Sequence, residues 1–318
     1  MDYRLLRSTI NDMRIAYVNI WPGFELNDYP EKCFFTRILR EVDPQLQVDI
    51  GMHLGAKYDI IFSMFIPNKA SSTYQDMNKV DCKSICFSPE NVGDAISITP
   101  GCGAYISFSD IQRQDIKYLK FPFYTMCHYD YLYRFNCSSF EELKAKFKKN
   151  FYEKKYSVAI SNPNNQLRTE VLRILVSMGL CYSGGSVYNN TGQIGWEHNS
   201  KIEFSSKTMY GMAFENSSKI GYITEKIYEC FIAGTVPYYW GAPDIKEEFN
   251  PKAYHIFDSS NEQMANKSMQ HMIEVLSNDN LRQSMIDIDP FTGFKSDVWI
   301  KNGKQIVKDF IMNYIETK

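Results

Sequence analysis

The 318-residue sequence lacks an excess of charge of either sign. It contains 35 Lys and Arg against 37 Asp and Glu, which gives a formal net charge of −2. Proteins that hold nucleic acid or an anionic membrane through bulk electrostatics carry a clear basic excess. The balance therefore excludes a general nucleic-acid-binding role, and charge alone indicates no other partner.

Long apolar runs and paired cysteines are also missing. The first 21 residues lack the apolar stretch of a secretory signal, and the longest apolar-leaning run, Tyr58 to Pro67, is too short to cross a bilayer. Eight scattered cysteines without a C-x-x-C pair are typical of buried free thiols rather than a disulfide framework or zinc site. We therefore expect a soluble, cytoplasmic protein without a transmembrane segment. Peripheral contact with a membrane stays open.

The length predicts two domains, because a single hydrophobic core rarely serves so many residues. Continuous apolar runs in the first half suit strands buried on both faces of a parallel sheet. They are Arg14 to Ile20, Asp59 to Ile66, Lys83 to Phe87 and Ala104 to Phe108. The helix-like stretch 139–150, whose last turns are rich in lysine, is typical of a solvated face or a linker, and we place the domain boundary there. We predict an α/β fold with domains at 1–150 and 151–296, and a terminal helix, 297–318, that packs on the body.

The second half opens with a strand, a polar loop and a helix. Tyr156 to Ile160 is the predicted strand, Ser161 to Asn165 (SNPNN) is the loop, and apolar residues then recur at helical spacing until Gly179. Arg168 falls in the first turn of this helix, where backbone N–H groups and the helix dipole favour an anion. The alternative is that Arg168 simply faces solvent.

A second unit of the same kind follows. Thr208 to Phe214 is the strand, 215–221 is a polar loop, and a helix extends from a Thr224 cap to Gly234, before the next strand, Val236 to Trp240. Successive units of this kind imply a parallel sheet, whose ligands bind at the carboxyl ends of the strands. The loops with Ser161, Asn162, Asn216 and Tyr222 should lie there.

Lys226 occupies the first helical turn of the second unit, as Arg168 does in the first. A lysine there is unfavourably placed against the helix dipole, which indicates an anion nearby. The two cations could neutralise the charge that develops on a departing diphosphate. Glu225 could accept hydrogen bonds from sugar hydroxyls, while Asn216 and Tyr222 could contact a nucleotide or sugar. Alternatively, Glu225 only complements the dipole.

The segment FENSSKIGYITEKIYECFIAGTVPYYWGAP, from Phe214 to Pro243, closely resembles the nucleotide-sugar-binding signature of the α1,3-fucosyltransferases. Further similar blocks occur in the same order as in that family. They are SNPNNQLR (161–168), SGGSVYN (183–189), FNPKAY (249–254) and, more weakly, FPFY (121–124). The resemblance therefore extends over most of the chain.

The α1,3-fucosyltransferases form glycosyltransferase family 10. The resemblance to them implies a GT-B type fold, in which two Rossmann-like domains have parallel sheets that face a central cleft. The first domain would bind the acceptor and the second the donor, GDP-fucose, with no obligatory metal or other cofactor. Arg168 and Lys226 are similar to the family's phosphate-binding cations and Glu225 to its fucose-binding carboxylate. Asn216 and Tyr222 are similar to its donor contacts.

The catalytic base is expected in the first domain. An inverting displacement needs a group that takes the proton of the attacking hydroxyl. Glu90, in SPEN just after a predicted strand, resembles the family's proposed base, although Ser88 and Pro89 replace residues often found there. The alternative is an ordinary turn residue. His128, after FPFYTMC, could line the acceptor site.

One competing motif is Asp287-Ile288-Asp289, which has the D-x-D form that holds Mn²⁺ or Mg²⁺ in another class of glycosyltransferase. It precedes Pro290 and adjoins no strand end, so we interpret it as a helix terminus. The five histidines show no metal-ligand spacing. No metal site is expected.

The resulting hypothesis is an inverting α1,3-fucosyltransferase that moves fucose from GDP-β-L-fucose to an N-acetyllactosamine-like oligosaccharide, giving a Lewis-type product. Two alternatives stay open. One is a catalytically idle protein that binds a GDP-sugar or glycan, and the other is a transferase that uses a different GDP-sugar.

Overall fold

The computed structural model describes residues 13–20, 29–64, 73–91, 99–109, 115–160, 163–195 and 198–317. The chain forms two compact units. The first extends to Asp130 and also includes 301–318, and the second is Tyr131–Ile300. The divisions fall inside helices α4 (Phe123–Phe135) and α12 (Lys295–Glu316).

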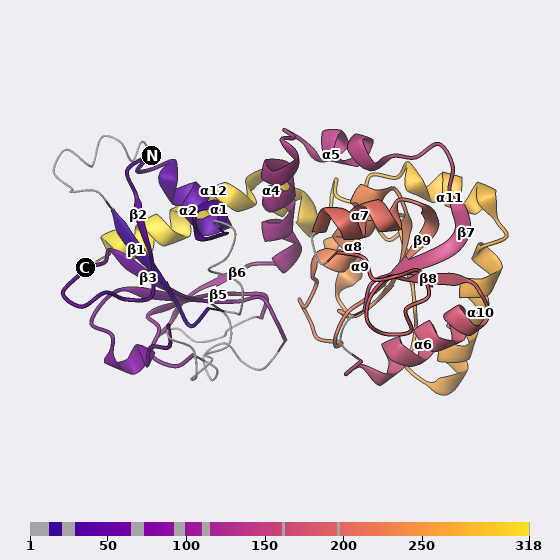
Figure 1. Cartoon of the computed structure of the whole chain (residues 1–318), viewed down its shortest axis with the longest axis horizontal. Coiled ribbons are helices and arrows are strands. Elements are labelled where there is room, and N and C mark those ends of the chain that lie inside the picture. The colour runs from indigo at the N-terminus through magenta and orange to yellow at the C-terminus, as the bar shows by residue number, and fades with distance from the viewer. Residues whose placement is uncertain are drawn as a thin grey trace. The chain divides into compact units, whose positions relative to one another are not determined.

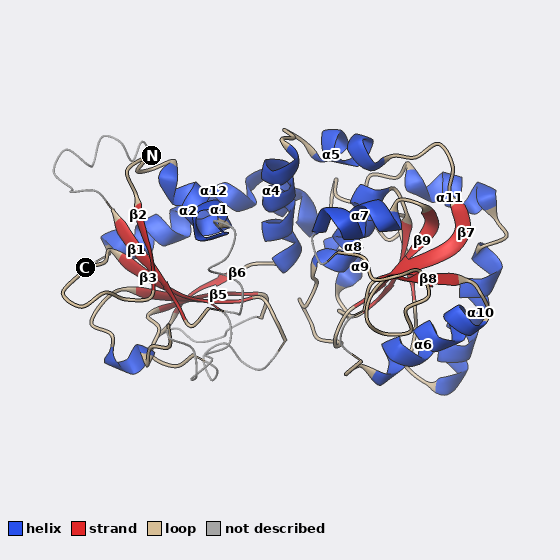
Figure 2. Ribbon diagram, in the orientation of Figure 1, coloured by secondary structure: helices blue, strands red, loops and turns tan. Residues whose placement is uncertain are grey.

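The first unit contains a six-stranded sheet in the order β2-β1-β3-β4-β5-β6, with every pair of neighbours parallel (Figure 2). The strands are β1 Arg14–Val18, β2 Gln47–Ile50, β3 Ile60–Met64, β4 Ser84–Ser88, β5 Ala104–Ser107 and β6 Lys117–Lys120. Every residue of β3, β4 and β5 is buried. The continuous apolar runs therefore mark strands covered on both faces, as the sequence predicted.

Aromatic packing covers this sheet. Helix α2 (Phe34–Arg40) follows the short helix α1 (Tyr29–Lys32), and a 3-10 turn, η1, spans Met77–Lys79. The ring of Phe35 lies 5.1 Å from that of Phe62 in β3 and 5.0 Å from that of Phe87 in β4, measured between centroids. Stacked and edge-on aromatic pairs of this kind add to the free energy of apolar burial.

The predicted terminal helix is α12, and its last turns pack on the first unit. The Nζ of Lys83 donates to the backbone carbonyls of Tyr314 at 2.8 Å and Ile315 at 2.5 Å, and the Tyr314 hydroxyl accepts from the Ser84 N–H at 3.4 Å. A cation at a helix carboxyl end satisfies carbonyls that have no partner within the helix. Gly103 makes the contact possible, because a Cβ there would meet the Tyr314 hydroxyl at 2.0 Å.

The second unit contains a five-stranded parallel sheet in the order β11-β10-β9-β7-β8 (Figure 1). Its strands are β7 Glu153–Val158, β8 Cys181–Ser183, β9 Thr208–Phe214, β10 Val236–Trp240 and β11 His255–Ile256. Its helices are α5 Phe140–Phe147, α6 Gln166–Ser177, α7 His198–Ser205, α8 Glu225–Ala233, α9 Ile245–Glu248, α10 Glu262–Val275 and α11 Asp279–Ile286. Together the two sheets confirm the predicted α/β class with two parallel sheets.

Side chains on β9 alternate between two packing environments. Tyr210, Met212 and Phe214 join a cluster with buried residues of α6 and α10. The residue between the first two, Gly211, faces α8, where an added Cβ would meet the Cys230 Sγ at 2.3 Å. The two-residue period of a strand thus places helices on both faces, and the missing side chain lets α8 approach closely.

The observed division at Asp130 lies before the predicted boundary at residue 150, because the lysine-rich stretch is not a linker. Helix α5 is amphipathic, and it buries Phe140, Leu143 and Phe147. The ring of Phe140 lies 4.7 Å from that of Phe291 and 5.9 Å from that of Tyr228. Its lysines mark only the exposed face, and the helix belongs to the second unit.

All eight cysteines are free thiols, and six of them are buried, as the scattered spacing predicted. Among the helices that the structure describes, none is both long and apolar enough to span a membrane.

Two histidines of the second unit meet against its tyrosine-rich core. The rings of His255 and His271 lie 4.9 Å apart, and the Tyr238 hydroxyl shares a 2.9 Å hydrogen bond with the Nδ1 of His271. Burial, together with the charge of His271, lowers the pKa of His255 to about 4. The folded protein therefore holds His255 neutral at a pH where an unfolded chain protonates it.

Acid should therefore weaken the second unit. The unfolded state binds the proton of His255 below its ordinary pKa of 6.5, whereas the folded state does so only near 4. Stability is present above pH 6.5 and is lost as the pH falls, by at most about 2 kcal/mol between pH 7 and pH 5. Urea unfolding at both pH values measures the loss. The loss should shrink in His255→Gln, and an equal loss in both proteins would contradict this assignment.

Candidate functional site

The carboxyl ends of β7 and β9 carry the two loops that the sequence singled out. These strands are direct neighbours in the sheet and run parallel. Asn165 is the N-cap of α6, and its Oδ1 accepts the N–H of Arg168 at 2.8 Å. Arg168 is therefore in the first turn of a helix that follows a strand and loop, as predicted.

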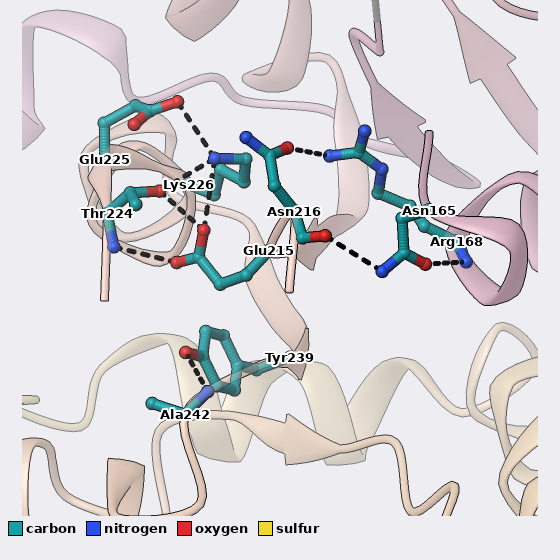
Figure 3. Close-up of polar contacts among 9 residues, drawn as sticks. All are labelled: Asn165, Arg168, Glu215, Asn216, Thr224, Glu225, Lys226, Tyr239 and Ala242. Atoms are coloured by element: carbon teal, nitrogen blue, oxygen red, sulfur yellow. Dashed lines mark hydrogen bonds and ion pairs between the residues drawn. The ribbon is translucent and has the colours of Figure 1, made fainter. Parts of the chain in front are cut away.

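The Arg168 side chain connects the two loops. Its Nη1 donates to the Oδ1 of Asn216 at 2.5 Å, and the Nδ2 of Asn165 donates to the carbonyl of Asn216 at 3.0 Å (Figure 3). Arg168 is only 4% exposed. Burial lowers the pKa of its guanidinium, and nearby Glu215, Tyr222 and Glu225 oppose that shift. The neutral amide of Asn216 orients the guanidinium without cancelling its charge.

Lys226 lies in the first turn of α8 and contacts oxygens of three residues. Its Nζ lies 2.8 Å from the Thr224 Oγ1, 3.1 Å from a Glu215 oxygen and 3.4 Å from a Glu225 oxygen (Figure 3). Gly234, in the left-handed conformation at φ 69°, ends the helix, as predicted. The lysine therefore has two carboxylate neighbours, whereas Arg168 donates to the amide oxygen of Asn216.

Glu215 is a central member of the site that sequence analysis missed. It follows β9, is fully buried, and accepts from the Thr224 N–H at 2.8 Å and the Thr224 hydroxyl at 2.7 Å. Burial raises the pKa of its carboxyl, and Lys226 opposes that shift. Thr224 is the N-cap by position, but its side chain does not cap α8, because its hydroxyl is turned to Glu215. The sequence feature that could have identified Glu215 is an acidic residue directly after a mostly apolar strand.

A pocket lies against these groups and encloses about 510 Å³, part of it open to solvent. Its charged lining residues are Arg168, Lys201, Glu225, Lys226 and Glu229. The structure thus brings together both predicted cations and the predicted carboxylate. Lys201, from α7, had no sequence signal, because α7 has neither a motif nor an amphipathic pattern that would mark one of its lysines.

The other predicted residues of this site are placed differently. Tyr222 is 1% exposed, while Asn216 is exposed. Burial of the Tyr222 ring restricts the ring-face contact that the sequence suggested. Ser161 and Asn162 lie outside the residues that the structure describes.

In the first unit, Glu90 is half-buried and lies two residues beyond the end of β4. It is therefore at the carboxyl edge of the first sheet, as predicted from its sequence position. His128 is 2% exposed on α4, with its ring 4.8 Å from that of Tyr129. This burial makes His128 a packing residue rather than an open surface contact.

The D-x-D motif has a structural role at the end of α11. Asp287 is the C-cap of this helix, and the Oδ1 of Asp289 accepts the N–H of Phe291 at 2.8 Å. This geometry agrees with the interpretation as a helix terminus. Within the described residues, no group of three or more His, Cys, Asp and Glu side chains is arranged to hold a metal ion.

Comparison with known proteins bears on the unit that holds the pocket. Residues 152–285 match the model of the C-terminal domain of glycosyltransferase family 10 (fucosyltransferase). The second unit is therefore similar to the C-terminal domain of that family. The family 10 segment contains both helix starts of the site and all of the pocket lining.

Curated relatives of this family match shorter segments. An α-(1,3)-fucosyltransferase, FucT, of Helicobacter pylori is 38% identical over 98 residues, which are 31% of this chain and 20% of the relative. A putative fucosyltransferase-like protein of Arabidopsis thaliana is 37% identical over 68 residues, 21% of this chain and 12% of the relative. The chain thus matches well under two thirds of either relative.

Solved structures are similar in fold to both units of the chain. The crystal structure of an α1,3-fucosyltransferase with GDP-fucose superposes with a TM-score of 0.72 at 18% identity, over 96% of this chain and 91% of that one. A trehalose 6-phosphate synthase from Burkholderia multivorans gives a TM-score of 0.52 at 8% identity, over 96% of this chain and 98% of that one. The predicted GT-B type fold is thereby confirmed.

Substitution of Gly241 should disturb the packing around Glu215. A Cβ at Gly241 would lie 2.5 Å from the Glu215 Cγ and 2.6 Å from the Tyr239 hydroxyl, both of which are buried. Gly241→Ala should therefore lower the free energy of unfolding by about 1–3 kcal/mol, measured by urea unfolding. Gly195→Ala is the matched control, because its Cβ would meet the Ser200 side chain alone, with the Oγ at 3.0 Å and the Cβ at 3.5 Å. Equal effects of the two substitutions would contradict the packing assigned to Glu215.

Proposed function

We propose that this protein is an inverting fucosyltransferase that moves L-fucose from GDP-β-L-fucose to a hydroxyl of an N-acetylglucosamine-containing oligosaccharide, in α1,3 linkage. The acceptor oxygen attacks the anomeric carbon of fucose, and the bond from that carbon to the β-phosphate oxygen breaks. GDP leaves with the bonding electron pair, and Glu90 takes the proton of the acceptor hydroxyl.

The observation that carries this proposal is the convergence of Arg168 and Lys226 on one pocket. Both lie in the first turn of a helix, where the dipole also favours an anion. Both line the pocket that Glu225 shares. A diphosphate leaving group develops negative charge as its bond to the sugar breaks, and fixed cations lower the free energy of that transition state.

The sugar specificity in this proposal rests on Glu225. Its carboxylate is beside the Nζ of Lys226, at 3.4 Å, so a sugar attached to the bound phosphate would come within its reach. A carboxylate accepts hydrogen bonds from sugar hydroxyls. The family 10 assignment and the fold shared with an α1,3-fucosyltransferase solved with GDP-fucose support fucose as that sugar.

Neutralisation by Arg168 and Lys226 makes the proposed reaction independent of metal. Purified protein, incubated with GDP-fucose and N-acetyllactosamine in excess chelator, should release GDP and form a fucosylated product detectable by mass spectrometry. Competition binding with GDP-mannose and UDP-sugars tests the choice of donor. GDP binding without turnover on any acceptor of a glycan panel would instead support the idle binding protein.

Separate variants should divide donor binding from proton transfer. Arg168→Ala removes a phosphate-binding cation and should weaken GDP binding roughly tenfold or more. Glu90→Ala removes the proposed base, so turnover should fall about a hundredfold or more while GDP affinity changes little. Calorimetric titration with GDP and initial rates measure the two effects. A comparable loss of GDP binding in both variants would exclude Glu90 as the base.

A further inference from the structure

Glu215 is unusual because its ionisable carboxyl group is fully buried. Burying an ionisable group costs free energy unless its hydrogen bonds are satisfied. Its contacts converge on the start of one helix: the N–H of Thr224 at 2.8 Å, the hydroxyl of Thr224 at 2.7 Å and the Nζ of Lys226 at 3.1 Å. Both carboxylate oxygens are therefore used at the start of α8.

The backbone and packing around Glu215 hold its side chain in one place. Its N–H donates to the carbonyl of Trp240 at 2.8 Å, which fixes the end of β9 against β10. Gly241 packs directly against the Glu215 side chain, since an added Cβ at Gly241 would lie 2.5 Å from the Glu215 Cγ and 2.6 Å from the Tyr239 hydroxyl. The Tyr239 hydroxyl in turn accepts the N–H of Ala242 at 2.9 Å (Figure 3). The carboxylate is thus a rigid part of the fold.

Lys226 and Arg168 differ in how many contacts are needed to hold the charged group in one position. A guanidinium is planar and is oriented by a single well-placed partner, whereas a lysine ammonium ends a flexible four-carbon stem. The structure gives Arg168 the amide of Asn216, and it gives Lys226 a carboxylate and a hydroxyl that are themselves bonded to each other. The triangle of Glu215, Thr224 and Lys226 restrains the ammonium at the pocket.

We propose that Glu215 is a positioning residue that fixes the Lys226 ammonium for the donor diphosphate before the donor binds. This inference rests on the proposed function. Binding and catalysis gain when charges that stabilise a leaving group are already in place, because no free energy is then spent in arranging them. Glu225, the other carboxylate near Lys226, lines the pocket and stays available to the sugar.

A double-mutant cycle tests whether Glu215 acts through Lys226. The four proteins are the wild type, Glu215→Gln, Lys226→Met and the double variant, each measured for GDP affinity by calorimetry and for kcat and KM with GDP-fucose. Glutamine keeps the shape, and its carbonyl oxygen accepts the Thr224 N–H, but the NH2 group that replaces the second carboxylate oxygen cannot accept a hydrogen bond from the ammonium. We expect Glu215→Gln to weaken GDP binding roughly tenfold in the wild type, and to add less than about twofold when residue 226 is already changed.

Thr224→Val provides a second test if Glu215→Gln does not fold, as thermal unfolding would reveal. It removes the hydroxyl that contacts both Glu215 and Lys226 and keeps the side-chain shape. Its loss of GDP affinity should likewise vanish in the Lys226→Met background.

Each outcome of the cycle separates the inference from the proposed function. The positioning role would be overturned if Glu215→Gln caused no loss of GDP affinity. It would also be overturned if the losses of GDP affinity in Glu215→Gln and Lys226→Met multiplied in the double variant. Either result would leave the donor site intact. An unchanged GDP affinity in Lys226→Met would overturn the donor site itself, and the positioning role with it.

Discussion

The parallel pairing of β7 with β9 is the constraint on which the pocket lined by Arg168 and Lys226 depends. Tyr156 pairs with Tyr210 and Ser157 with Gly211, so the two strands end side by side at one edge of the sheet. Each strand leads through a short loop into a helix, and the two helix starts meet there. Had either strand run the other way, Arg168 and Lys226 would lie at opposite edges. The meeting of these two helix starts at one edge follows from strand direction before any side chain is considered.

The two cations of the site are balanced in different ways. Arg168 is buried and donates to the neutral amide of Asn216, and Glu215 and Glu225 act on its charge from nearby. Lys226 shares its charge with Glu215 behind it and Glu225 beside it. The pocket therefore combines a guanidinium that donates to an amide with an ammonium that contacts two carboxylates.

Much of the fold was predictable because its signals are local. Strands β9 and β10 begin and end at the predicted residues, since apolar runs there are bounded by turn formers on both sides. The half-buried strands β2 and β6 and the short strands β8 and β11 were missed, as they contain few buried apolar residues. The domain boundary was placed too late, because lysines on the exposed face of α5 hid the apolar face that packs on Phe291.

The sequence by itself determined the site residues that lie beside a strand end or a helix start, namely Arg168, Glu225 and Lys226. Local spacing and the family 10 signature both pointed to them, and all three line one pocket. Only the tertiary structure decided the roles of Glu215 and Lys201. Glu215 looked like an ordinary loop acid, and its burial arises because β10 and Gly241 close over it. Lys201 comes from a helix that is distant in sequence, and no local pattern encodes which lysine a fold turns toward a pocket.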